Sequence, residues 1–286
     1  MTAPLTPLAP AIEAIEGAEA LDAPAKALGK WVRGAVGGEP LKDVLSGTWL
    51  GHAVHPVLTD VVIGAFLSST LLDFLGGDDG ERARRRLVTA GIAAAAPTVL
   101  TGANDWADSE PADDGVRRAG LVHALSNATA VTLYASSLAT GGRGAWALRT
   151  GGAAALMLGG YLGGHLSFTK GVGPDQTVYD PGPEDWTAAA DASQLQDRRP
   201  LRVVVDDTPV LLLRDGDELF AIHDRCSHRG CSLSEGSLEG DEIVCACHGS
   251  RFDRRDGGVR QGPATAPQPA FEVRVRDERV EVRRRA

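Results

Sequence analysis

Cysteine and histidine side chains gather in one short stretch near the C-terminal end of the 286-residue sequence. All four cysteines of the chain lie there, in the strings CSHRGC and CACH. Each string offers one thiolate and one imidazole at turn spacing, Cys226 with His228 and Cys245 with His248. Two thiolates and two imidazoles suit a 2Fe-2S cluster in which two histidines replace two cysteines on one iron. The same four groups also suit a single tetrahedral zinc ion.

The residues around these strings favour the cluster, because they resemble the Rieske family well beyond the ligands. Gly230 lets the first loop turn tightly, and HGSRFD (248–253) resembles the second cluster loop of that family. GPA (262–264), which contains Pro263, resembles the proline loop that covers the cluster. A zinc site leaves these flanking motifs unexplained. The resemblance therefore implies a C-terminal all-β domain whose 2Fe-2S cluster is held by the two cysteines and two histidines named above.

Two cysteines, Cys231 and Cys247, are not needed as ligands. In the high-potential Rieske proteins of quinol-oxidising complexes, the matching positions form a disulfide that ties the two cluster loops together. The resemblance therefore implies a disulfide in this chain. The alternative is two small buried thiols, because cysteine spacing does not fix connectivity.

Two further positions bear on the reduction potential through the same resemblance. Ser250 matches the serine whose hydroxyl hydrogen-bonds to a cluster sulfur, and Phe252 stands where high-potential members carry a tyrosine. Hydrogen bonds to the sulfurs tune the potential. The missing hydroxyl at residue 252 thus predicts a potential below that of quinol-oxidising Rieske proteins.

The ligand histidines and the remaining C-terminal histidine have different expected roles. Neutral imidazoles raise the potential of a cluster relative to four thiolates, and the outer ring nitrogens of His228 and His248 can couple an electron to a proton. His223 is interpreted as a surface histidine at the end of a strand. No histidine follows His248, so the mononuclear iron site of a Rieske oxygenase catalytic subunit is not expected downstream.

Composition divides the rest of the chain into elements that must position this site. After residue 186, alternating runs such as RVVV, PVLLL and EVRVRDERVEV predict short antiparallel strands. Before residue 169, four weakly charged stretches are each long enough to cross a ~30 Å hydrocarbon layer as a helix; they cover 51–75, 86–106, 119–139 and 145–168. The predicted fold class is α+β with two domains, in the order 1–50 (N-terminal amphipathic segment), 51–168 (four-helix transmembrane bundle), 169–185 (linker) and 186–286 (all-β Rieske domain).

A soluble helical bundle is the alternative for residues 51–168, because Ala and Gly outnumber Leu and Ile there. The motifs Gly159-x-x-x-Gly163 and Gly160-x-x-x-Gly164 favour the close helix packing found in lipid. The strings GHAVHPVLTDVVIG, TGANDW and GGYLGGHLSF resemble an uncharacterised bacterial four-helix membrane family that is sometimes fused to redox domains. This second resemblance implies the architecture and no reaction.

If the four helices alternate in direction, the other histidines all lie at the membrane face from which the chain leaves for its C-terminal domain; these are His52, His55, His123 and His165. One interpretation is a b-type haem or metal site formed by two or more of them, which exchanges electrons with the cluster. The alternative is a structural network with Asn104, Asp105 or Asn127. Asp60, about two turns inside the first helix, is expected to join this network.

Positive charge predicts the orientation of the bundle. Six arginines lie at the opposite face, in the first loop and at the start of the fourth helix: Arg82, Arg84, Arg85, Arg86, Arg143 and Arg149. By the positive-inside rule this face is cytoplasmic and the Rieske domain extracytoplasmic, where a disulfide is stable. Residues 1–50 lack the basic start and apolar run of a signal peptide. Their apolar positions predict amphipathic helices that lie on the membrane surface or pack on the bundle; these are Ile12, Ile15, Leu21, Leu28, Trp31 and Val32.

The net charge of −9 gives no nucleic-acid footprint. We therefore predict a multi-pass cell-membrane protein that relays single electrons between a membrane donor, such as a quinol or a haem, and another redox partner. One alternative is a Rieske-type ferredoxin component that supplies an oxygenase or reductase. Another is a redox or iron sensor without turnover.

Overall fold

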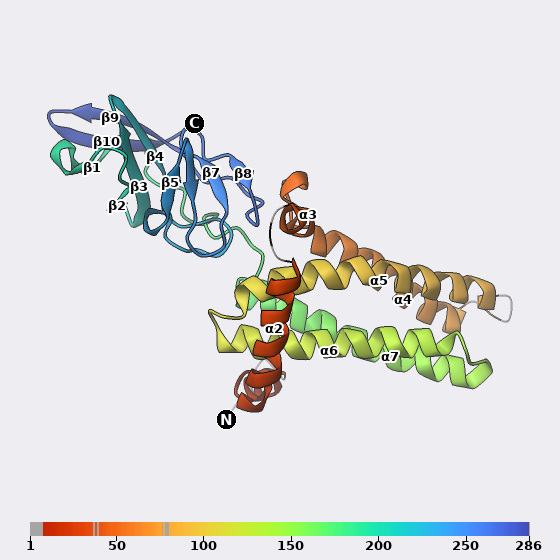
Figure 1. Ribbon diagram of the computed structural model, residues 1–286. Helices are drawn as coiled ribbons and strands as arrows, with labels where there is room; N and C mark the ends of the chain where they lie inside the picture. The colour runs from red at the N-terminus through yellow and green to blue at the C-terminus, as the bar shows by residue number, and fades with distance from the viewer. Residues whose placement is uncertain (1–7, 37, 39, 76, 78–79, 286) are drawn as a thin grey trace. The chain divides into compact units, whose positions relative to one another are not determined.

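The computed structural model describes residues 8–36, 38, 40–75, 77 and 80–285 (Figure 1). The chain forms two compact units, one made of Met1–Gly37 with Val54–Val172 and the other of Gly38–Ala53 with Gly173–Ala286. The first unit is helical and the second is built mainly of strands. The predicted division into a helical N-terminal part and an all-β C-terminal part is confirmed. The segment Gly38–Ala53, which the sequence placed with the N-terminal helices, belongs to the second unit.

Four long helices form the core of the first unit: α4 (Val54–Leu75), α5 (Glu81–Ser109), α6 (Asp114–Ser137) and α7 (Gly142–Gly164). A single π-helical turn, η4 (His165–Thr169), continues α7. Both α4 and α6 pack against α5 and α7, so α4 and α6 lie at opposite corners of the bundle. Two helices, α4 and α5, are long and apolar enough to cross a membrane by length and composition.

Aromatic packing holds the middle of the bundle together. The rings of Phe66 on α4 and Tyr134 on α6 stack with centroids 4.1 Å apart and an interplanar angle of 5°. Glycines on the two other helices make room for this stack, because a Cβ atom at Gly91 would lie 2.5 Å from Phe66 and one at Gly152 would lie 2.9 Å from Tyr134. The Tyr134 hydroxyl lies 2.6 Å from Oγ1 of Thr70. The small residues of these helices therefore allow close contact across the bundle.

A buried ion-pair cluster closes the bundle at the α4–α5 loop. Arg149 donates two hydrogen bonds to the Asp73 carboxylate, at 2.7 and 2.6 Å, and Nε of Arg84 lies 3.4 Å from the same carboxylate. Both arginines are buried and pair with Asp73 inside the bundle. They are therefore not free surface charges, although the predicted orientation counted them as such. The exposed arginines at this end are Arg82, Arg85, Arg86 and Arg143.

The N-terminal helices cover the other end of the bundle. They are α1 (Ala9–Glu16), the short η1 (Glu19–Leu21) and α2 (Asp22–Val36), and they pack on α5 and α6. Ile12 and Val32 are buried, whereas the Trp31 side chain is 68% exposed. Ion pairs fix this cover, among them Arg118 with Asp22 at 2.7 Å and Arg33 with Glu110 at 2.7 Å. The sequence predicted that these helices either lie on the membrane surface or pack on the bundle. Their buried faces pack on the bundle.

Three antiparallel sheets make up the second unit. Their strands, in spatial order, are β1 (Thr187–Asp191), β10 (Arg279–Arg284) and β9 (Phe271–Arg276); β2 (Leu201–Val205), β3 (Thr208–Asp215) and β4 (Glu218–His223); and β5 (Ser237–Glu239), β6 (Glu242–Val244), β7 (Arg251–Asp253) and β8 (Val259–Gln261). Short helical turns complete the unit: α3 (Leu41–Ser46), η2 (Thr48–Leu50), η5 (Ala192–Gln194) and η6 (Leu233–Glu235).

One of the two hydrophobic cores of this unit supports the cysteine strings. Cys226 and Cys245 are buried in it together with Phe252. The aliphatic part of this core comes from several strands and η6, through Leu211, Leu213, Ile222, Leu233 and Ile243. The two free thiols therefore sit on a rigid apolar base formed by strands of two sheets.

Candidate metal centre

The first cysteine string forms a tight loop between β4 and β5. The carbonyl of Cys226 accepts a hydrogen bond from the N–H of Gly230 at 2.8 Å, and the N–H of Cys226 donates to the carbonyl of Cys231 at 2.8 Å. Gly230 has φ +76°, a left-handed conformation that glycine adopts without a Cβ penalty. As the sequence predicted, the turn is made at Gly230.

The second string forms the same loop at the tip of the β6–β7 hairpin. The carbonyl of Cys245 accepts from the N–H of Gly249 at 3.0 Å, and the N–H of Cys245 donates to the carbonyl of Ser250 at 2.9 Å. Gly249 has φ +79°. Because each loop closes on its own leading cysteine through the same two bonds, the two strings present their side chains in equivalent ways.

The thiols of Cys226 and Cys245 meet where the loops face each other, and both are buried. They share a hydrogen bond, which together with burial raises the pKa of Cys226. The same hydrogen bond lowers the pKa of Cys245 to about 6. The pair thus gives up one proton readily and holds the other, as two acids sharing a site do. A metal that accepts two thiolates would displace both.

The imidazoles of His228 and His248 also meet. Their ring centroids are 5.0 Å apart and their planes make an angle of 89°. Burial lowers the pKa of His228 well below its ordinary value, and the positive charges of His248, Lys42 and Arg229 act in the same direction. This environment favours the neutral imidazole, which is the form that binds iron. Each loop therefore contributes one thiol and one imidazole to a common site, and this donor set fits a 2Fe-2S cluster with mixed ligands.

The other two cysteines form a disulfide between Cys231 and Cys247, with an S–S distance of 2.03 Å. The sulfur of Cys245 lies within 4.8 Å of both sulfurs of this disulfide. These three cysteines form a group close enough to hold a metal, but the two joined sulfurs have no thiolate to offer. They form a covalent link between the loops, and Cys245 is the free thiol of this group.

Three predicted tuning residues surround the loops. Ser250 is fully buried, and its Oγ accepts the N–H of Ala264 at 3.0 Å, which leaves its hydroxyl proton available for another acceptor. Phe252 is fully buried in the core beneath the two free thiols and carries no polar atom there. Pro263 precedes Ala264 in the loop after β8, so this loop approaches the second string through Ser250.

A segment that the sequence analysis missed holds the proline loop from outside. Oδ1 of Asp43 accepts the N–H of Gly262 at 2.7 Å, and Oγ1 of Thr48 donates to the carbonyl of Ala264 at 3.3 Å. Glycine lets the loop come this close, because a Cβ atom at residue 262 would lie 2.1 Å from Oγ1 of Thr48. No local pattern around Asp43 or Thr48 signals this role, since their partners lie more than two hundred residues later in the chain.

The prediction that His223 lies on the surface is wrong. Its side chain is fully buried, Nδ1 accepts the N–H of Arg225 at 3.0 Å, and Nε2 lies 3.3 Å from Oδ2 of Asp180. Burial lowers the pKa of His223, and the Asp180 carboxylate only partly opposes that effect. The buried ring thus contacts the start of the first cysteine loop through Nδ1 and lies close to the Asp180 carboxylate.

Asp224, also missed, anchors both arms of the first loop. It is buried, Oδ1 accepts the N–H of Ser234 at 2.7 Å, and Oδ2 accepts the hydroxyl of Ser232 at 2.6 Å. Nε of Arg202 lies 3.1 Å from Oδ2 and compensates the charge. One sequence feature is consistent with this role. Asp224 lies two residues before Cys226, and Ser232 and Ser234 follow the end of the loop.

Of the four histidines predicted to lie at one membrane face, His52 belongs to the second unit, and the other three lie in the helical unit. His52 is exposed, with Nδ1 3.2 Å from the Ala53 carbonyl, and Nε2 of His165 lies 2.7 Å from Oε1 of Glu16. His55 and His123 each contact a backbone carbonyl oxygen, with Nδ1 of His55 3.0 Å from that of Thr98 and Nδ1 of His123 2.8 Å from that of Gly159. Asp60 is exposed on α4, so the prediction that it joins their network is wrong.

Known proteins resemble the second unit. A family model described as a Rieske [2Fe-2S] domain matches residues 185–272. The anthranilate 1,2-dioxygenase ferredoxin subunit of Burkholderia cepacia is 35% identical over 98 residues, which are 34% of this chain and 91% of that protein. Ferredoxin CarAc of Metapseudomonas resinovorans is 39% identical over 98 residues, which are 34% of this chain and 92% of that protein.

Among solved structures, the ferredoxin of carbazole 1,9a-dioxygenase from Nocardioides aromaticivorans IC177 shares 32% sequence identity. The superposition covers 36% of this chain and 100% of that chain, with a TM-score of 0.34. These similarities concern about a third of the chain.

Proposed function

The chain belongs to the Rieske [2Fe-2S] domain family, and from this premise we propose that it is a single-electron carrier tethered to a membrane by its helical unit. Its cofactor is the Rieske 2Fe-2S cluster, which takes up and releases one electron when bound. We propose that Cys226 and Cys245 hold one iron and that His228 and His248 hold the other.

The observation that carries this proposal is the meeting of two thiols and two imidazoles from two loops closed by the same hydrogen bonds. The buried core under Cys226 and Cys245 excludes water from the sulfur side of the site. His228 and His248 are only half buried. An electron therefore has its shortest route to a partner protein through the imidazole rings.

The printed names of the relatives favour a ferredoxin-type role. Two of them are a dioxygenase ferredoxin subunit and a ferredoxin, which are electron carriers for another protein. Phe252 supports this choice over quinol oxidation, because the buried ring offers no hydroxyl to a cluster sulfur. We propose that the acceptor is a separate redox enzyme, such as an oxygenase.

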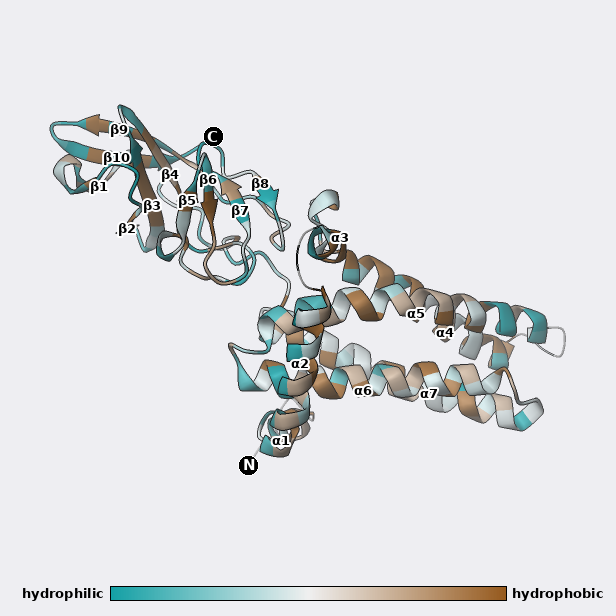
Figure 2. Cartoon of the chain, viewed as in Figure 1, coloured by the Kyte–Doolittle hydropathy of each residue, from teal (hydrophilic) through white to brown (hydrophobic). Residues whose placement is uncertain are grey.

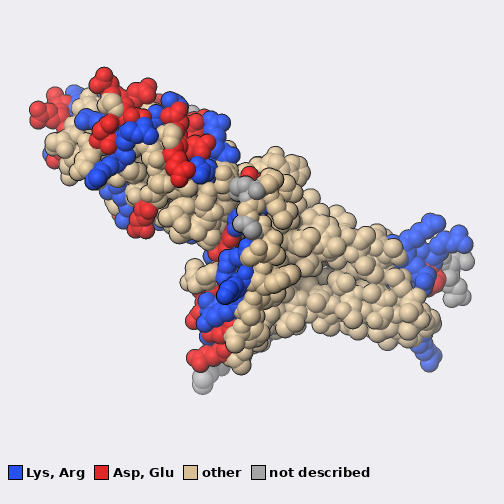
Figure 3. All heavy atoms as spheres, viewed as in Figure 1, with Lys and Arg blue, Asp and Glu red and all other residues tan. Residues whose placement is uncertain are grey.

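We further propose that all four long helices span the membrane. Three of them carry no Asp, Glu, Lys or Arg between Arg86 and Asp105 on α5, after Arg118 on α6, or after Arg149 on α7, whereas α4 carries the exposed Asp60. Figure 3 shows charged side chains gathered at the two ends of the bundle, and Figure 2 shows apolar residues along its length. Large apolar side chains are exposed on every helix, among them Val61, Leu71, Val99, Leu100, Leu125, Met157 and Leu158. Lipid is the solvent that suits such a surface.

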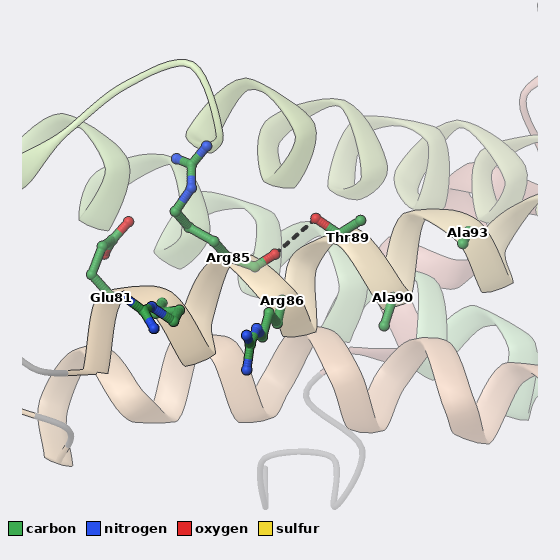
Figure 4. A pocket seen from close by; sticks show the side chains of 7 residues that line it. Glu81, Arg85, Arg86, Thr89, Ala90 and Ala93 are labelled. Carbon is green, nitrogen blue, oxygen red and sulfur yellow. Dashed lines mark hydrogen bonds between the residues drawn. The ribbon is translucent and has the colours of Figure 1, made fainter.

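The exposed arginines support an orientation with the α4–α5 loop in the cytoplasm. Arg82, Arg85 and Arg86 line a shallow groove on α5 together with Thr89 (Figure 4). A groove of this kind at the end of an apolar bundle suits the anionic headgroups of cytoplasmic lipids. Because α7 ends at the opposite end of the bundle, we propose that the cluster-binding unit is extracytoplasmic.

Electron relay is tested with the full-length chain in lipid vesicles. An NADH-dependent ferredoxin reductase supplies electrons, and a ferredoxin-dependent aromatic-ring dioxygenase accepts them. We expect repeated reduction and reoxidation of the cluster without loss of its absorbance, and slow reduction when a quinol replaces the reductase. Bleaching of the cluster at each reduction, with no oxygenase turnover, contradicts the relay and favours a sensor.

The membrane assignment is tested by alkaline carbonate extraction of cells that express the full chain. We expect the protein to stay in the membrane pellet with α4 to α7 in the bilayer. Release of the intact protein into the supernatant contradicts the four-span proposal, whatever the result of the relay assay.

A further inference from the structure

A short helical segment of the second unit has polar contacts on one side and exposed apolar side chains on another. It consists of α3 and η2, joined at Gly47, and is called the α3–η2 segment below. Its polar side chains hold the proline loop. Asp43 accepts the N–H of Gly262 at 2.7 Å, and Thr48 donates to the carbonyl of Ala264 at 3.3 Å.

Four large apolar side chains are exposed on the segment and form what we call its outer apolar face: Leu41, Val44, Trp49 and Leu50. Leu41 and Val44 are three residues apart, so they lie on one face of α3, and Asp43 lies on a different side of the helix. Nε1 of Trp49 donates to the carbonyl of Val44 at 3.2 Å, which places the indole ring next to α3. Trp49 is 66% exposed and Val44 is 54% exposed.

Exposed apolar side chains are concentrated in this segment. Among the described residues of the second unit, eight large apolar side chains are exposed, and four of them lie within the ten residues from Leu41 to Leu50. The others are Val178, Tyr179, Val204 and Val275. Single exposed apolar side chains are ordinary on a protein surface, whereas a contiguous group marks an interaction site.

The polar atoms behind the outer apolar face have partners within the segment. The indole N–H of Trp49, its one hydrogen-bonding group, is bonded to Val44. The backbone N–H groups of Gly47 and Leu50 donate to the carbonyls of Asp43 and Gly47, at 3.0 and 2.9 Å. These groups therefore do not need water, and the face can enter an apolar medium without leaving them unpaired.

The chain itself keeps this face close to the start of a membrane helix. Gly51, His52 and Ala53 are the three residues between Leu50 and Val54, where α4 begins. Four residue steps cover at most about 14 Å. Because α4 is long and apolar enough to cross a membrane, its insertion holds the outer apolar face within reach of the headgroup region, which is about 5–7 Å deep on each side of the hydrocarbon.

We propose that the outer apolar face binds the lipid surface and that the lipid thereby helps to hold the proline loop. Tryptophan suits the headgroup level because its ring is large and amphipathic, and the neighbouring Leu and Val side chains add the buried apolar area on which interfacial binding depends. The inference rests on the proposed membrane span of α4. It does not depend on which redox partner the cluster serves.

Site-specific photo-cross-linking tests lipid contact in membranes of cells that express the full-length chain. The photoreactive amino acid p-benzoylphenylalanine replaces Val44 or Trp49, and mass spectrometry identifies the adduct. Leu100 on α5 is the control for the proposed spans, and Val204 on β2 is the control for a water-facing apolar residue, since both are similarly exposed. The electron paramagnetic resonance signal of the cluster reports folding of each variant.

We expect phospholipid adducts at positions 44, 49 and 100 and none at position 204. Lipid adducts at position 100 with none at 44 and 49 overturn this inference and leave the four-span proposal standing. A cross-link from 44 or 49 to protein, whether a second copy, another protein or another part of this chain, also overturns it. Lipid adducts at none of the four positions overturn both proposals.

The link to the proline loop is tested by hydrogen exchange of the full-length protein in lipid nanodiscs. The double variant Leu41→Gln/Val44→Gln removes apolar side chains from the outer face, keeps Asp43 and Thr48, and keeps a good helix former at each position. We expect exchange of the peptide that contains Gly262 to be several-fold faster than in the unmodified protein. Val204→Gln is the control and should leave that peptide unchanged. Equal exchange in all three proteins would show that lipid does not hold the loop.

Discussion

At the scale of single residues, Phe252 is the side chain on which the choice of partner depends most. Its ring is fully buried in the core that holds Cys226 and Cys245. Ser250 on the same side of the site still has a hydroxyl proton to donate, because its oxygen accepts from Ala264. The site thus has the Ser250 hydroxyl alone, whereas the resemblance to high-potential Rieske proteins implies a second hydroxyl, from a tyrosine at the position of Phe252.

We expect Phe252→Tyr to raise the reduction potential of the cluster. A hydroxyl that donates to a cluster sulfur stabilises the reduced, more negative state, and one hydrogen bond of about 1 kcal/mol corresponds to roughly 40 mV for a one-electron couple. Protein-film voltammetry of the two proteins measures the shift. Phe220→Tyr is the control, because Phe220 packs at the edge of the same core. An unchanged potential in Phe252→Tyr contradicts the hydrogen-bond explanation.

His223 gives the domain a pH-dependent contribution to stability. The buried ring accepts from the N–H of Arg225 and faces the charges of Asp180, Asp224 and Arg225. Protonation of Nδ1 would replace that acceptor with a second donor. Burial lowers the pKa of His223 in the folded state, so the unfolded chain binds the extra proton first as pH falls.

The free energy of unfolding should therefore be insensitive to His223 above about pH 6.5, the ordinary histidine pKa, and should fall as pH drops below it toward the lowered folded-state value. In His223→Asn, whose side-chain oxygen can still accept from Arg225, this part of the acid sensitivity should disappear. Urea titrations followed by cluster absorbance at several pH values measure it. Equal acid sensitivity in both proteins would show that His223 does not titrate between the two states.

Sequence reasoning failed at His223 for a physical reason. A histidine at the end of a strand is usually exposed, and nothing in its neighbourhood indicates burial. The covering carboxylate comes from Asp180, in the segment expected to be a linker. By contrast, the tight turn at Gly230 was predictable, because tight cluster loops need specific residue types at fixed spacing. The choice of the four cluster ligands stays a prediction.

At the scale of elements, the proline loop is held from two sides. From inside, the Ser227 hydroxyl donates to the carbonyl of Ala266 at 2.8 Å, and Nε2 of Gln268 donates to the carbonyl of Arg225 at 3.1 Å. From outside, Asp43 of α3 accepts the N–H of Gly262. The short helix α3 is therefore part of the wall around the cluster site, although it precedes the bundle in the chain.

We expect Asp43→Ala to loosen the proline loop. Loss of one hydrogen bond of about 1 kcal/mol should speed hydrogen exchange of the peptide that contains Gly262 about fivefold. Asp43→Asn is the matched control, because its side-chain oxygen can still accept from Gly262, and it should exchange like the unmodified protein. Mass spectrometry of exchanged peptides provides the measurement. Equal exchange in all three proteins would mean that α3 does not restrain the loop.

The elements themselves were largely predictable. Long weakly charged runs indicated all four bundle helices, and alternating apolar residues indicated strands such as β9 and β10. The contact between Asp43 and Gly262 was not predictable, because the two residues are 219 positions apart. Pairing across such a separation depends on how the chain folds back, which periodicity does not report.

At the scale of the whole molecule, each unit is stabilised by its own internal contacts. In the helical unit, buried ion pairs close both ends and leave an apolar middle, with Arg149 and Asp73 at one end and Arg117 and Glu110 at the other. In the second unit, two loops and a disulfide enclose one site. Composition distinguished the helical part of the chain from the strand-rich part, but it did not place Gly38–Ala53 in the second unit. It also could not show that Arg84 and Arg149 are internal partners of Asp73, because burial depends on packing between helices.

The most direct test of the central claim is the low-temperature electron paramagnetic resonance spectrum of the reduced, full-length protein. Ligation by Cys226, Cys245, His228 and His248 predicts a 2Fe-2S signal with an average g value lower than that of a four-thiolate cluster, and with hyperfine coupling to two imidazole nitrogens. A spectrum typical of four thiolate ligands, or no signal from protein that contains iron and sulfide, would contradict the account.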